Sequence, residues 1–331
     1  MTNLLPYNTF GIEARTAHFA EVQTVAELRQ ELRRAAAPVL VLGGGSNILF
    51  TQDWPGTVVR NAIGGMAVVR RFKNRVWVRA GGGESWHGLV QWAVSNGLGG
   101  VENMSLIPGS VGAAPVQNIG AYGVELRDVF VSLEAVELAT GKTRHFNRAQ
   151  CRFGYRDSVF KSTEKGRYCI TSVTLSLTIN GHRIQTDYGD ITKTLTEMGV
   201  SQPGIADVSA AVIRIRSAKL PDPAHIGNCG SFFKNPEVTR GVFEKIRQGF
   251  AVAPHYDLPD DRVKIPAGWL IEQCGWKGKR VGNTGCHDKQ ALVLVNHGGA
   301  TGAEVVALAR AIIESVEKTF GVRLEPEVNV L

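Results

Sequence analysis

The sequence predicts an α+β protein. Some segments place apolar residues at helical spacing behind capping signals, and others are short apolar or alternating runs bounded by turn residues. The 331 residues are 44% hydrophobic and 20% charged, which describes an ordinary globular protein that is long enough for two or three domains. The chain shows no internal repeat and no low-complexity segment.

Helices and strands are mixed in the first hundred residues. Thr24-Val-Ala-Glu27 is a capping box that opens a helix through about Arg34. Strands are predicted over residues 38–42, 58–59, 66–70 and 75–80. A second helix follows from the apolar spacing of Trp86, Leu89, Val90, Ala93 and Val94, and Asn96-Gly97 ends it.

The remaining elements are a hairpin (129–138 and 143–146), strands at 169–179 and 291–295, and three helices. Asp207 is expected to cap the first helix, whose apolar face is Val208, Ala211, Val212 and Ile215. A short helix covers 269–274, and a capping box at Thr301 opens a long one through about Phe320. Prolines at 221 and 223 indicate a domain boundary near 218.

Composition limits the compartment and the partners. No apolar run is long enough to span a membrane and the N-terminus lacks a signal-peptide layout, so we expect a cytoplasmic protein without membrane partners. The five cysteines are scattered and lack CxxC spacing, which favours reduced thiols and no metal site. The net charge of +7 suits anionic ligands such as nucleotides. Nucleic acid stays an alternative, but we expect none because the positive residues are dispersed.

The segment Gly227–Pro236 (GNCGSFFKNP) combines a thiol, a hydroxyl, an ammonium group and amides with two adjacent Phe residues. Apolar walls with a few polar groups are typical of a small-molecule site. If the segment is extended, Cys229, Ser231 and Phe233 share one face. An ordinary loop closed by Asn-Pro is the alternative.

Two glycine segments can hold a phosphorylated ligand. VLVLGGGSNILF looks like a Rossmann glycine turn, but Ile48 occupies the position of the third glycine and no helix follows. Its backbone N–H groups can still form an anion nest, and tight turns without a ligand are the alternative. The long segment 107–123 lacks apolar periodicity, and its small residues allow close backbone approach to a large flat ligand whose edges Gln117 and Asn118 could read.

With GGGSN, IPGSVGAAPVQNIGAYG, YRDSVFK, GNCGSFFKNP and LEPEV in this order, the chain resembles the UDP-N-acetylenolpyruvoylglucosamine reductases over essentially its whole length. The resemblance implies a vanillyl-alcohol-oxidase-type FAD-binding fold with subdomains 1–62 and 63–217 and a C-terminal substrate domain 218–331. It implies non-covalent FAD and a monomer that uses NADPH to reduce UDP-N-acetylglucosamine-enolpyruvate to UDP-N-acetylmuramate for peptidoglycan.

The resemblance also implies site residues. Those expected to bind FAD are Gly43, Gly44, Gly45, Ser46, Asn47, Pro108, Gly109, Ser110, Gly112, Gln117, Asn118 and Gly123. Those expected to be catalytic are Arg156, Ser231 and Glu327. Those expected to contact substrate are Tyr155, Tyr188, Lys219, Asn235 and Gln290, with Tyr188 matching the tyrosine that closes over substrate in the longer-loop subgroup.

These residue types suit the implied reaction, in which hydride addition to a vinyl carbon creates a carbanion beside a carboxylate. Arg156 can pair with the carboxylate and stabilise developing charge, whereas its structural alternative is a salt bridge to an acid such as Asp157. Ser231 would protonate the carbanion, with Lys234 or water restoring its proton, although a free hydroxyl is a weak acid. Glu327 could donate a proton or orient another group.

Three alternatives remain open at this point: a flavin- or nucleotide-binding module without reductase activity, an FAD oxidase, and a basic nucleic-acid binder. Cys229 could replace Ser231 as the acid, and Glu325 rivals Glu327 because both share one face of an extended LEPEV segment.

Overall fold

In the computed structural model, which describes residues 1–331, the chain divides into two units. The first unit contains residues 1–2, 16–45 and 54–218. The second contains residues 3–15, 46–53 and 219–331. The three domains implied by the resemblance stay a prediction.

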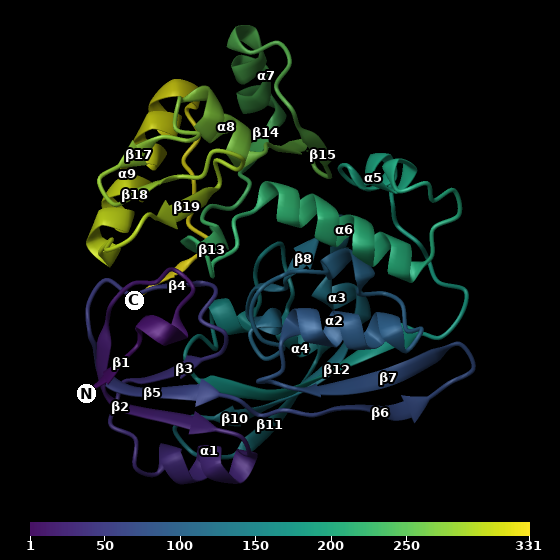
Figure 1. The fold of residues 1–331 in the computed structure, drawn as a ribbon, viewed down its shortest axis with the longest axis vertical. Helices are drawn as coiled ribbons and strands as arrows, with labels where there is room; N and C mark the ends of the chain where they lie inside the picture. The colour runs from purple at the N-terminus through teal and green to yellow at the C-terminus, as the bar shows by residue number, and fades with distance from the viewer. The chain divides into compact units, whose positions relative to one another are not determined.

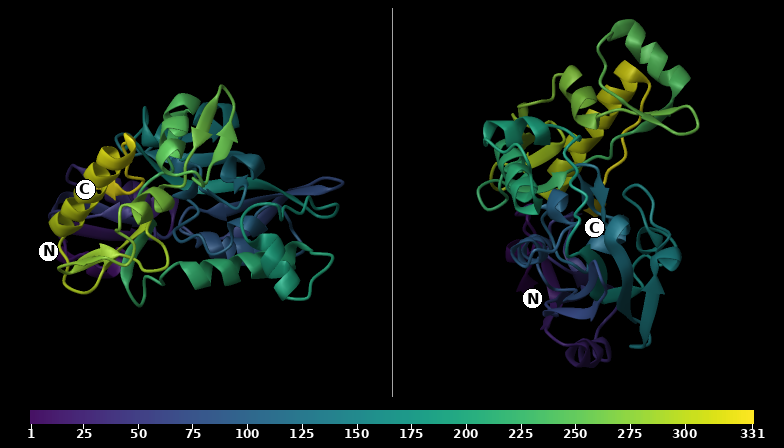
Figure 2. Two further views of the ribbon diagram at one scale, coloured as in Figure 1. Left: turned by 90° about the horizontal axis from the view of Figure 1, so that it is seen from above. Right: turned by 90° about the vertical axis from the view of Figure 1, so that its right-hand side faces the viewer.

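A five-stranded antiparallel sheet in the order β11-β10-β12-β7-β6 is the centre of the first unit. Its strands are β6 (Met66–Arg71), β7 (Arg75–Gly81), β10 (Phe130–Glu137), β11 (Thr143–Asn147) and β12 (Tyr168–Thr178). Alternation sends Val76 and Val78 of β7 to a buried face, and Arg75 and Trp77 to the opposite face. The β6–β7 hairpin projects at one end of this sheet (Figures 1 and 2).

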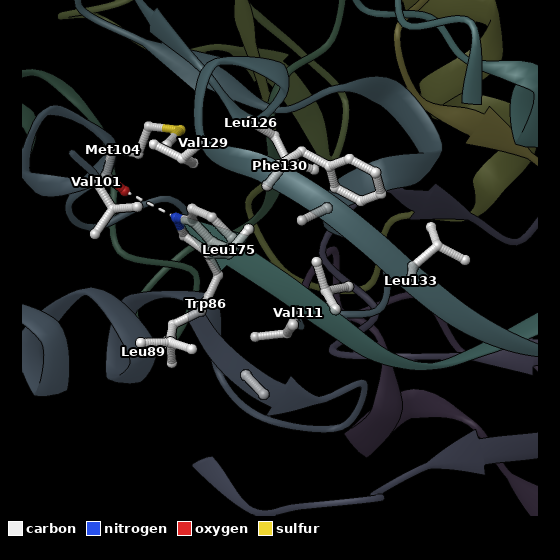
Figure 3. Packing of buried hydrophobic residues seen from close by; sticks show 14 of the residues in the cluster. Trp86, Leu89, Val101, Met104, Val111, Leu126, Val129, Phe130, Leu133 and Leu175 are labelled. Carbon is white, nitrogen blue, oxygen red and sulfur yellow. Dashed lines mark hydrogen bonds between the residues drawn. The ribbon is translucent and has the colours of Figure 1, made fainter. Parts of the chain in front are cut away.

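Helix α2 (Trp86–Ser95) packs on the buried face of this sheet (Figure 1). Ser85 caps it by accepting a hydrogen bond from the Gly88 backbone N–H, and Asn96 ends it. Trp86 is fully buried in the same cluster as Leu175 and Phe130, and its indole N–H donates to the Met104 carbonyl oxygen at 3.1 Å (Figure 3). This indole therefore fills the core without leaving a buried donor unpaired.

A smaller sheet in the order β1-β2-β5-β3, in which β2, β5 and β3 run parallel, lies on the opposite side of the five-stranded sheet together with α1 (Figure 1). Its elements are β1 (Thr2–Asn3), β2 (Arg15–Val22), α1 (Val25–Leu32), β3 (Val39–Leu42) and β5 (Trp54–Asn61). Val22, Leu28 and Val59 from these elements pack with Val136 and Cys169 of the larger sheet.

Short elements complete the first unit. They are β8 (Gly120–Ala121), β9 (Val124–Glu125), α3 (Leu126–Val129), α4 (Arg148–Cys151), α5 (Ile191–Glu197) and α6 (Ile205–Lys219), with 3₁₀ turns at 102–104, 114–117 and 159–161. The prediction that Asp207 caps α6 is wrong. The helix begins at Ile205, and the Asp207 carboxylate accepts a hydrogen bond from the Gly204 backbone N–H from within the first turn.

The second unit contains a sheet in the order β13-β19-β18-β17, a three-stranded sheet in the order β14-β16-β15, and the two-stranded pair β4–β20. Its strands are β4 (Ile48–Leu49), β13 (Gly227–Ser231), β14 (Glu237–Thr239), β15 (Tyr256–Leu258), β16 (Arg262–Lys264), β17 (Arg280–Val281), β18 (Thr284–Cys286), β19 (Val293–Asn296) and β20 (Asn329–Val330). Its α-helices are α7 (Arg240–Gly249), α8 (Ala267–Gln273) and α9 (Gly302–Phe320). The predicted capping box of α9 is confirmed, since Thr301 and Glu304 exchange hydrogen bonds and Gly321 ends the helix with φ of 66°.

The predicted α+β class and the positions of its helices and strands are confirmed, with shifts of a few residues at the ends of elements. The segment 107–123 is not wholly irregular, because it contains a 3₁₀ turn at Ala114–Gln117 and the strand β8. No helix combines the length and the hydropathy required to cross a bilayer. The cytoplasmic location and the monomeric state stay predictions.

Replacing Trp86 tests the packing of α2 on the sheet. We expect Trp86→Ala to lower the free energy of unfolding by about 3–5 kcal/mol, because it leaves a cavity and strands the Met104 carbonyl group. Trp86→Phe should lose less, since it keeps most of the buried ring. Urea unfolding followed by circular dichroism measures both, and equal midpoints for Trp86→Ala and the wild type would contradict this account.

Candidate active site

The two glycine segments singled out in the sequence lie against each other in the first unit. A Cβ atom on Gly43 would lie 2.3 Å from Ser110 Oγ, and one on Gly44 would lie 3.2 Å from Gly109 Cα. The Gly44–Gly109 contact joins two backbones, which residues without side chains allow, whereas the Gly43 contact is with the Ser110 side chain. The two glycine segments therefore form two loops that lie in direct contact.

Backbone donors in these loops fit an anionic group. The N–H groups of Gly43, Gly44, Gly109 and Ser110 donate no hydrogen bond within the protein, and neither 43–47 nor 108–112 contains an acidic residue. Unpaired N–H groups on adjacent tight turns are a suitable site for phosphate oxygens. The loops thus fit the pyrophosphate of a dinucleotide such as FAD.

A third glycine segment, Gly81–Gly83, belongs to the same framework. A Cβ atom on Gly82 would lie 2.1 Å from the Ile170 carbonyl oxygen, and the Gly112 backbone N–H donates to the Gly82 carbonyl oxygen at 2.8 Å. Sequence reasoning treated this segment only as the end of a strand. The triple glycine was the signal that could have identified it.

The predicted cofactor residues do not all lie together. Gly43–Gly45 belong to the first unit, whereas Ser46 and Asn47 belong to the second. Gly123 (φ of 82°) lies near Gln185 and Tyr188 and lines a cavity with none of the loop residues just described.

Asn118 holds the second loop in place. It is fully buried and adopts a left-handed conformation with φ of 44°. Its side-chain N–H groups donate to Glu125 and to the Gly154 carbonyl oxygen, and its Oδ1 accepts from the Arg127 backbone N–H. Both amide donors are therefore used within the protein, which leaves neither to read a flavin edge.

Arg156 is held by its backbone and by one directed hydrogen bond. Its φ of 51° lies in the left-handed region, which costs free energy in a non-glycine residue and often marks functional positions. The guanidinium Nη2 donates to the Gly120 carbonyl oxygen at 2.7 Å, and the group lies 5.5 Å from the Tyr155 ring centre. These contacts leave Arg156 few orientations.

Arg216 of α6 is a second cation in this region that sequence reasoning missed. Burial lowers its pKa from the usual value, the Tyr122 side chain opposes that shift, and the charge of Arg156 adds to it, so the three side chains are neighbours. The group stays protonated near neutrality because an arginine pKa remains far above 7. Nothing in the sequence distinguishes Arg216 from the other polar residues of the helix.

His87 is the neutral partner of this cluster. Its Nδ1 accepts the Leu106 backbone N–H at 3.0 Å. Burial and then the positive charge of Arg216 lower its pKa from 6.5, so the imidazole is uncharged at neutral pH.

Tyr188 lies at the edge of the same region and is 42% exposed. Its ring packs edge-on against Tyr122 with ring centres 6.4 Å apart. Tyr122 itself has φ of 49°, so several residues of this region hold uncommon backbone conformations.

In the second unit, the expectation that Cys229, Ser231 and Phe233 share a face is wrong. The pairing of β13 with β19 shifts by one residue between Asn228 and Ser231, which is a β-bulge, and Gly230 takes φ of 73° there. A bulge breaks the strict alternation of side chains. Cys229 and Phe233 are buried, whereas Ser231 is exposed.

The segment after the bulge is bonded on both sides. The Phe232 N–H donates to the Leu292 carbonyl oxygen, and the Phe232 carbonyl oxygen accepts from the Glu327 N–H, both at 2.8 Å. The Lys234 N–H donates to the Glu325 carbonyl oxygen at 2.9 Å. GNCGSFFKNP and LEPEV, nearly a hundred residues apart in the chain, therefore lie side by side and pair through an isolated bridge between Phe233 and Pro326.

The two glutamates of LEPEV differ in environment. The Glu325 side chain is 76% exposed and forms an ion pair with Lys234 at 3.6 Å. Glu327 is half-buried and lies near Cys229, since burial and then the Glu327 charge raise the pKa of that thiol. Asn47 donates a long hydrogen bond (3.4 Å) to the Glu327 carbonyl oxygen and accepts one from the Asn329 side chain.

Asn235 and Gln290 both lie at the start of α8. Asn235 Oδ1 accepts the Ala267 N–H at 2.9 Å. Gln290 Oε1 accepts the Leu292 N–H at 3.4 Å, and a Cβ atom on Gly268 would lie 2.9 Å from it. The two side-chain NH₂ groups donate no hydrogen bond within the protein. Lys219, the last residue of α6, is exposed.

No group of three or more His, Cys, Asp or Glu side chains is arranged to hold a metal ion.

Two family models and many known proteins match this chain. Residues 15–147 match the model of an FAD binding domain, and residues 222–331 match that of the UDP-N-acetylenolpyruvoylglucosamine reductase C-terminal domain. Proteins named UDP-N-acetylenolpyruvoylglucosamine reductase are 48% identical in Flavobacterium johnsoniae, over 99% of this chain and 98% of that protein, and 51% in Pseudomonas aeruginosa, over 99% and 97%.

A solved structure shows the same fold. The crystal structure of UDP-N-acetylenolpyruvylglucosamine reductase from Thermus caldophilus superposes with a TM-score of 0.66 at 26% identity, over 99% of this chain and 97% of that one. The expected FAD-binding α+β fold is confirmed.

Closing the gap between the glycine loops should displace the cofactor. We expect Gly43→Ala to weaken FAD binding by about tenfold, because the added methyl group collides with Ser110. The flavin-to-protein absorbance ratio after dialysis measures this effect. Gly88→Ala is the matched control, since its Cβ meets Ser85 at an ordinary 3.4 Å. Equal flavin content in both variants would contradict the close approach.

Proposed function

Because this chain belongs to the UDP-N-acetylenolpyruvoylglucosamine reductases, FAD-dependent oxidoreductases of peptidoglycan precursor synthesis, we propose that it takes hydride from NADPH and reduces UDP-N-acetylglucosamine-enolpyruvate to UDP-N-acetylmuramate. The observation that carries the residue assignment is the bulge at Gly230, which exposes Ser231 next to Phe232, the residue whose carbonyl oxygen accepts the Glu327 N–H. Bound FAD supplies the chemistry of hydride transfer from NADPH to the vinyl carbon.

The first task of the protein is to hold the carboxylate of the substrate. We assign it to Arg156, whose guanidinium is oriented by the Gly120 carbonyl oxygen. Arg216 adds a second positive charge nearby, and neutral His87 adds none. Together these groups stabilise the negative charge that develops on the substrate during hydride addition.

The second task is to deliver one proton, which we assign to Ser231. The rival acid, Cys229, is only 5% exposed. A proton donor must reach the reacting carbon, and the bulge gives that access to the hydroxyl rather than to the thiol.

Glu327 takes the supporting role in this proposal. Its backbone is fixed to Phe232, next to Ser231, whereas the Glu325 side chain is exposed and paired with Lys234. The same ion pair engages the Lys234 ammonium group, which could otherwise have returned a proton to Ser231. A water chain or Glu327 is therefore the better source of that proton.

The nucleotide part of the substrate is assigned to five side chains. Asn235 and Gln290 each offer an NH₂ group at the start of α8, and Lys219 offers a positive charge for the diphosphate. Tyr155 packs beside Arg156, and exposed Tyr188 can close over the bound substrate.

Replacing Ser231 separates proton delivery from the other steps. We expect Ser231→Ala to retain FAD and to be reduced by NADPH at the normal rate, while turnover falls about 100-fold or more. Stopped-flow absorbance measures reduction of the flavin by NADPH and its reoxidation by substrate as separate steps.

Cys229→Ala is the matched control for this variant. It removes a buried neighbouring side chain of similar size and should leave turnover within about twofold. Loss of turnover in Cys229→Ala together with normal turnover in Ser231→Ala would assign the acid to the thiol instead.

The visible spectrum distinguishes a reductase from an oxidase or a simple binding module. Under anaerobic conditions NADPH should bleach the bound flavin, and the enolpyruvyl substrate should restore its colour. A flavin that NADPH does not reduce, or that only O₂ reoxidises, would contradict the proposed reaction.

A further inference from the structure

A cavity of about 460 Å³ lies at the end of the five-stranded sheet, within the first unit. Arg75 of β7, Arg148 of α4 and Arg183 line it together with Ser176 and Thr178 of β12. None of the residues assigned above to catalysis or substrate binding lines it, and Gly123 is the single predicted cofactor residue that does.

The cavity has three unpaired positive charges. The side chains of Arg75, Arg148 and Arg183 form no hydrogen bond and no ion pair with the protein. Two acids also line the cavity, but each is engaged by a backbone N–H group: Glu102 by Gly100 at 2.6 Å, and Asp128 by Glu125 at 2.8 Å. The cavity therefore carries an excess of positive charge whose guanidinium groups are available to an anion.

An aromatic hollow of about 420 Å³ adjoins this cavity. Phe72 and Trp77 line it with Lys73 and Asn74, and it shares Arg75 and Ser176 with the first cavity. The strand register explains the junction, because Ser176 pairs with Trp77 and Thr178 pairs with Arg75 across β12 and β7. All four side chains lie on the sheet face opposite the core.

The rings present an accessible stacking surface. Phe72 is 41% exposed, and its ring centre lies 5.3 Å from that of Trp77. The Arg70 guanidinium lies over both rings, 5.0 and 5.2 Å from their centres. Exposed aromatic rings beside arginines are the usual means of binding a nucleobase by stacking, which accepts any of the bases.

We propose that this composite cavity binds a nucleoside di- or triphosphate, with the base stacked on Phe72 and Trp77 and the phosphates on Arg75, Arg148 and Arg183. Arg75 and Trp77 are two residues apart on one strand, hence about 6–7 Å along it. That spacing lets one ligand reach the rings and the guanidinium groups together. The site shares no residue with the paired glycine loops assigned to FAD, and Gly123 is the one expected cofactor residue in its lining.

Calorimetric titration of the FAD-loaded enzyme tests this proposal. ATP and inorganic tripolyphosphate are titrated separately, and the Trp77→Ala and Arg148→Ala variants identify the binding that belongs to this cavity. We expect saturable binding of one ATP per chain. Trp77→Ala should weaken ATP binding about tenfold or more but leave tripolyphosphate binding unchanged, because only the nucleotide stacks. Arg148→Ala should weaken both ligands.

Two controls keep the outcome interpretable. Arg34→Ala removes an exposed arginine of the same unit that lines neither hollow, and it should change nothing. Trp77→Phe keeps an aromatic ring and should retain most ATP binding. This variant serves as the test if Trp77→Ala destabilises the β6–β7 hairpin. Reductase turnover without added ATP should be normal in Trp77→Phe and Arg148→Ala.

Absence of saturable ATP binding would overturn the proposal, as would binding that survives Trp77→Ala and Arg148→Ala unchanged. Equal loss of ATP and tripolyphosphate binding in Trp77→Ala would also overturn the nucleotide assignment, because it would leave a phosphate site without a base site. Failure of the proposed reductase reaction would not affect these measurements, since they record binding alone.

Discussion

The close backbone approach of Gly43 and Gly44 to Gly109 and Ser110 is the constraint on which the first unit depends. One loop follows β3 of the smaller sheet, and the other comes after α2, which packs on the five-stranded sheet, so the contact links the two layers. It also leaves a set of backbone N–H groups unpaired side by side. Such donors lower the free energy of the fold only when an anion accepts them. We therefore expect stability and FAD binding to be linked through these loops.

In the second unit, Phe232 contributes to the structure in two ways. Its side chain is buried in the core, and its backbone bonds to Leu292, just before β19, on one side and to Glu327 on the other. The bulge at Gly230 lets the chain turn one residue outward immediately before this rigid element. Ser231 is thus exposed while its neighbours are immobilised, which meets the requirement that a proton donor be both accessible and held in position.

Much of this arrangement could be predicted from the sequence, because caps and apolar periodicity are local signals. Thr24 and Thr301 marked their helices correctly, and Gly321 marked an end. The bulge at Gly230 could not be predicted, since a glycine in a strand is compatible with regular pairing and only the register with β19 shows the extra residue. Arg216 and His87 were missed because their contact depends on tertiary packing. The basic and aromatic stretch 70–79 was overlooked because its strand pairing was unknown.

The nine residues 181–189 connect the two sites of the first unit. Arg183 and Gln185 line the cavity that contains Arg75 and Arg148. The Tyr188 ring packs against Tyr122, which lies near Arg156 and Arg216 of the proposed active site. Asn103 fixes the base of this segment by donating to the carbonyl oxygens of both Gln185 and Tyr122. A ligand in the cavity could shift Tyr188 only if it binds one arrangement of the segment more tightly than another. The Arg183 side chain is exposed and forms no hydrogen bond or ion pair within the protein, so a bound phosphate would change its position most easily. The two Asn103 hydrogen bonds are the contacts through which that change would reach Tyr122.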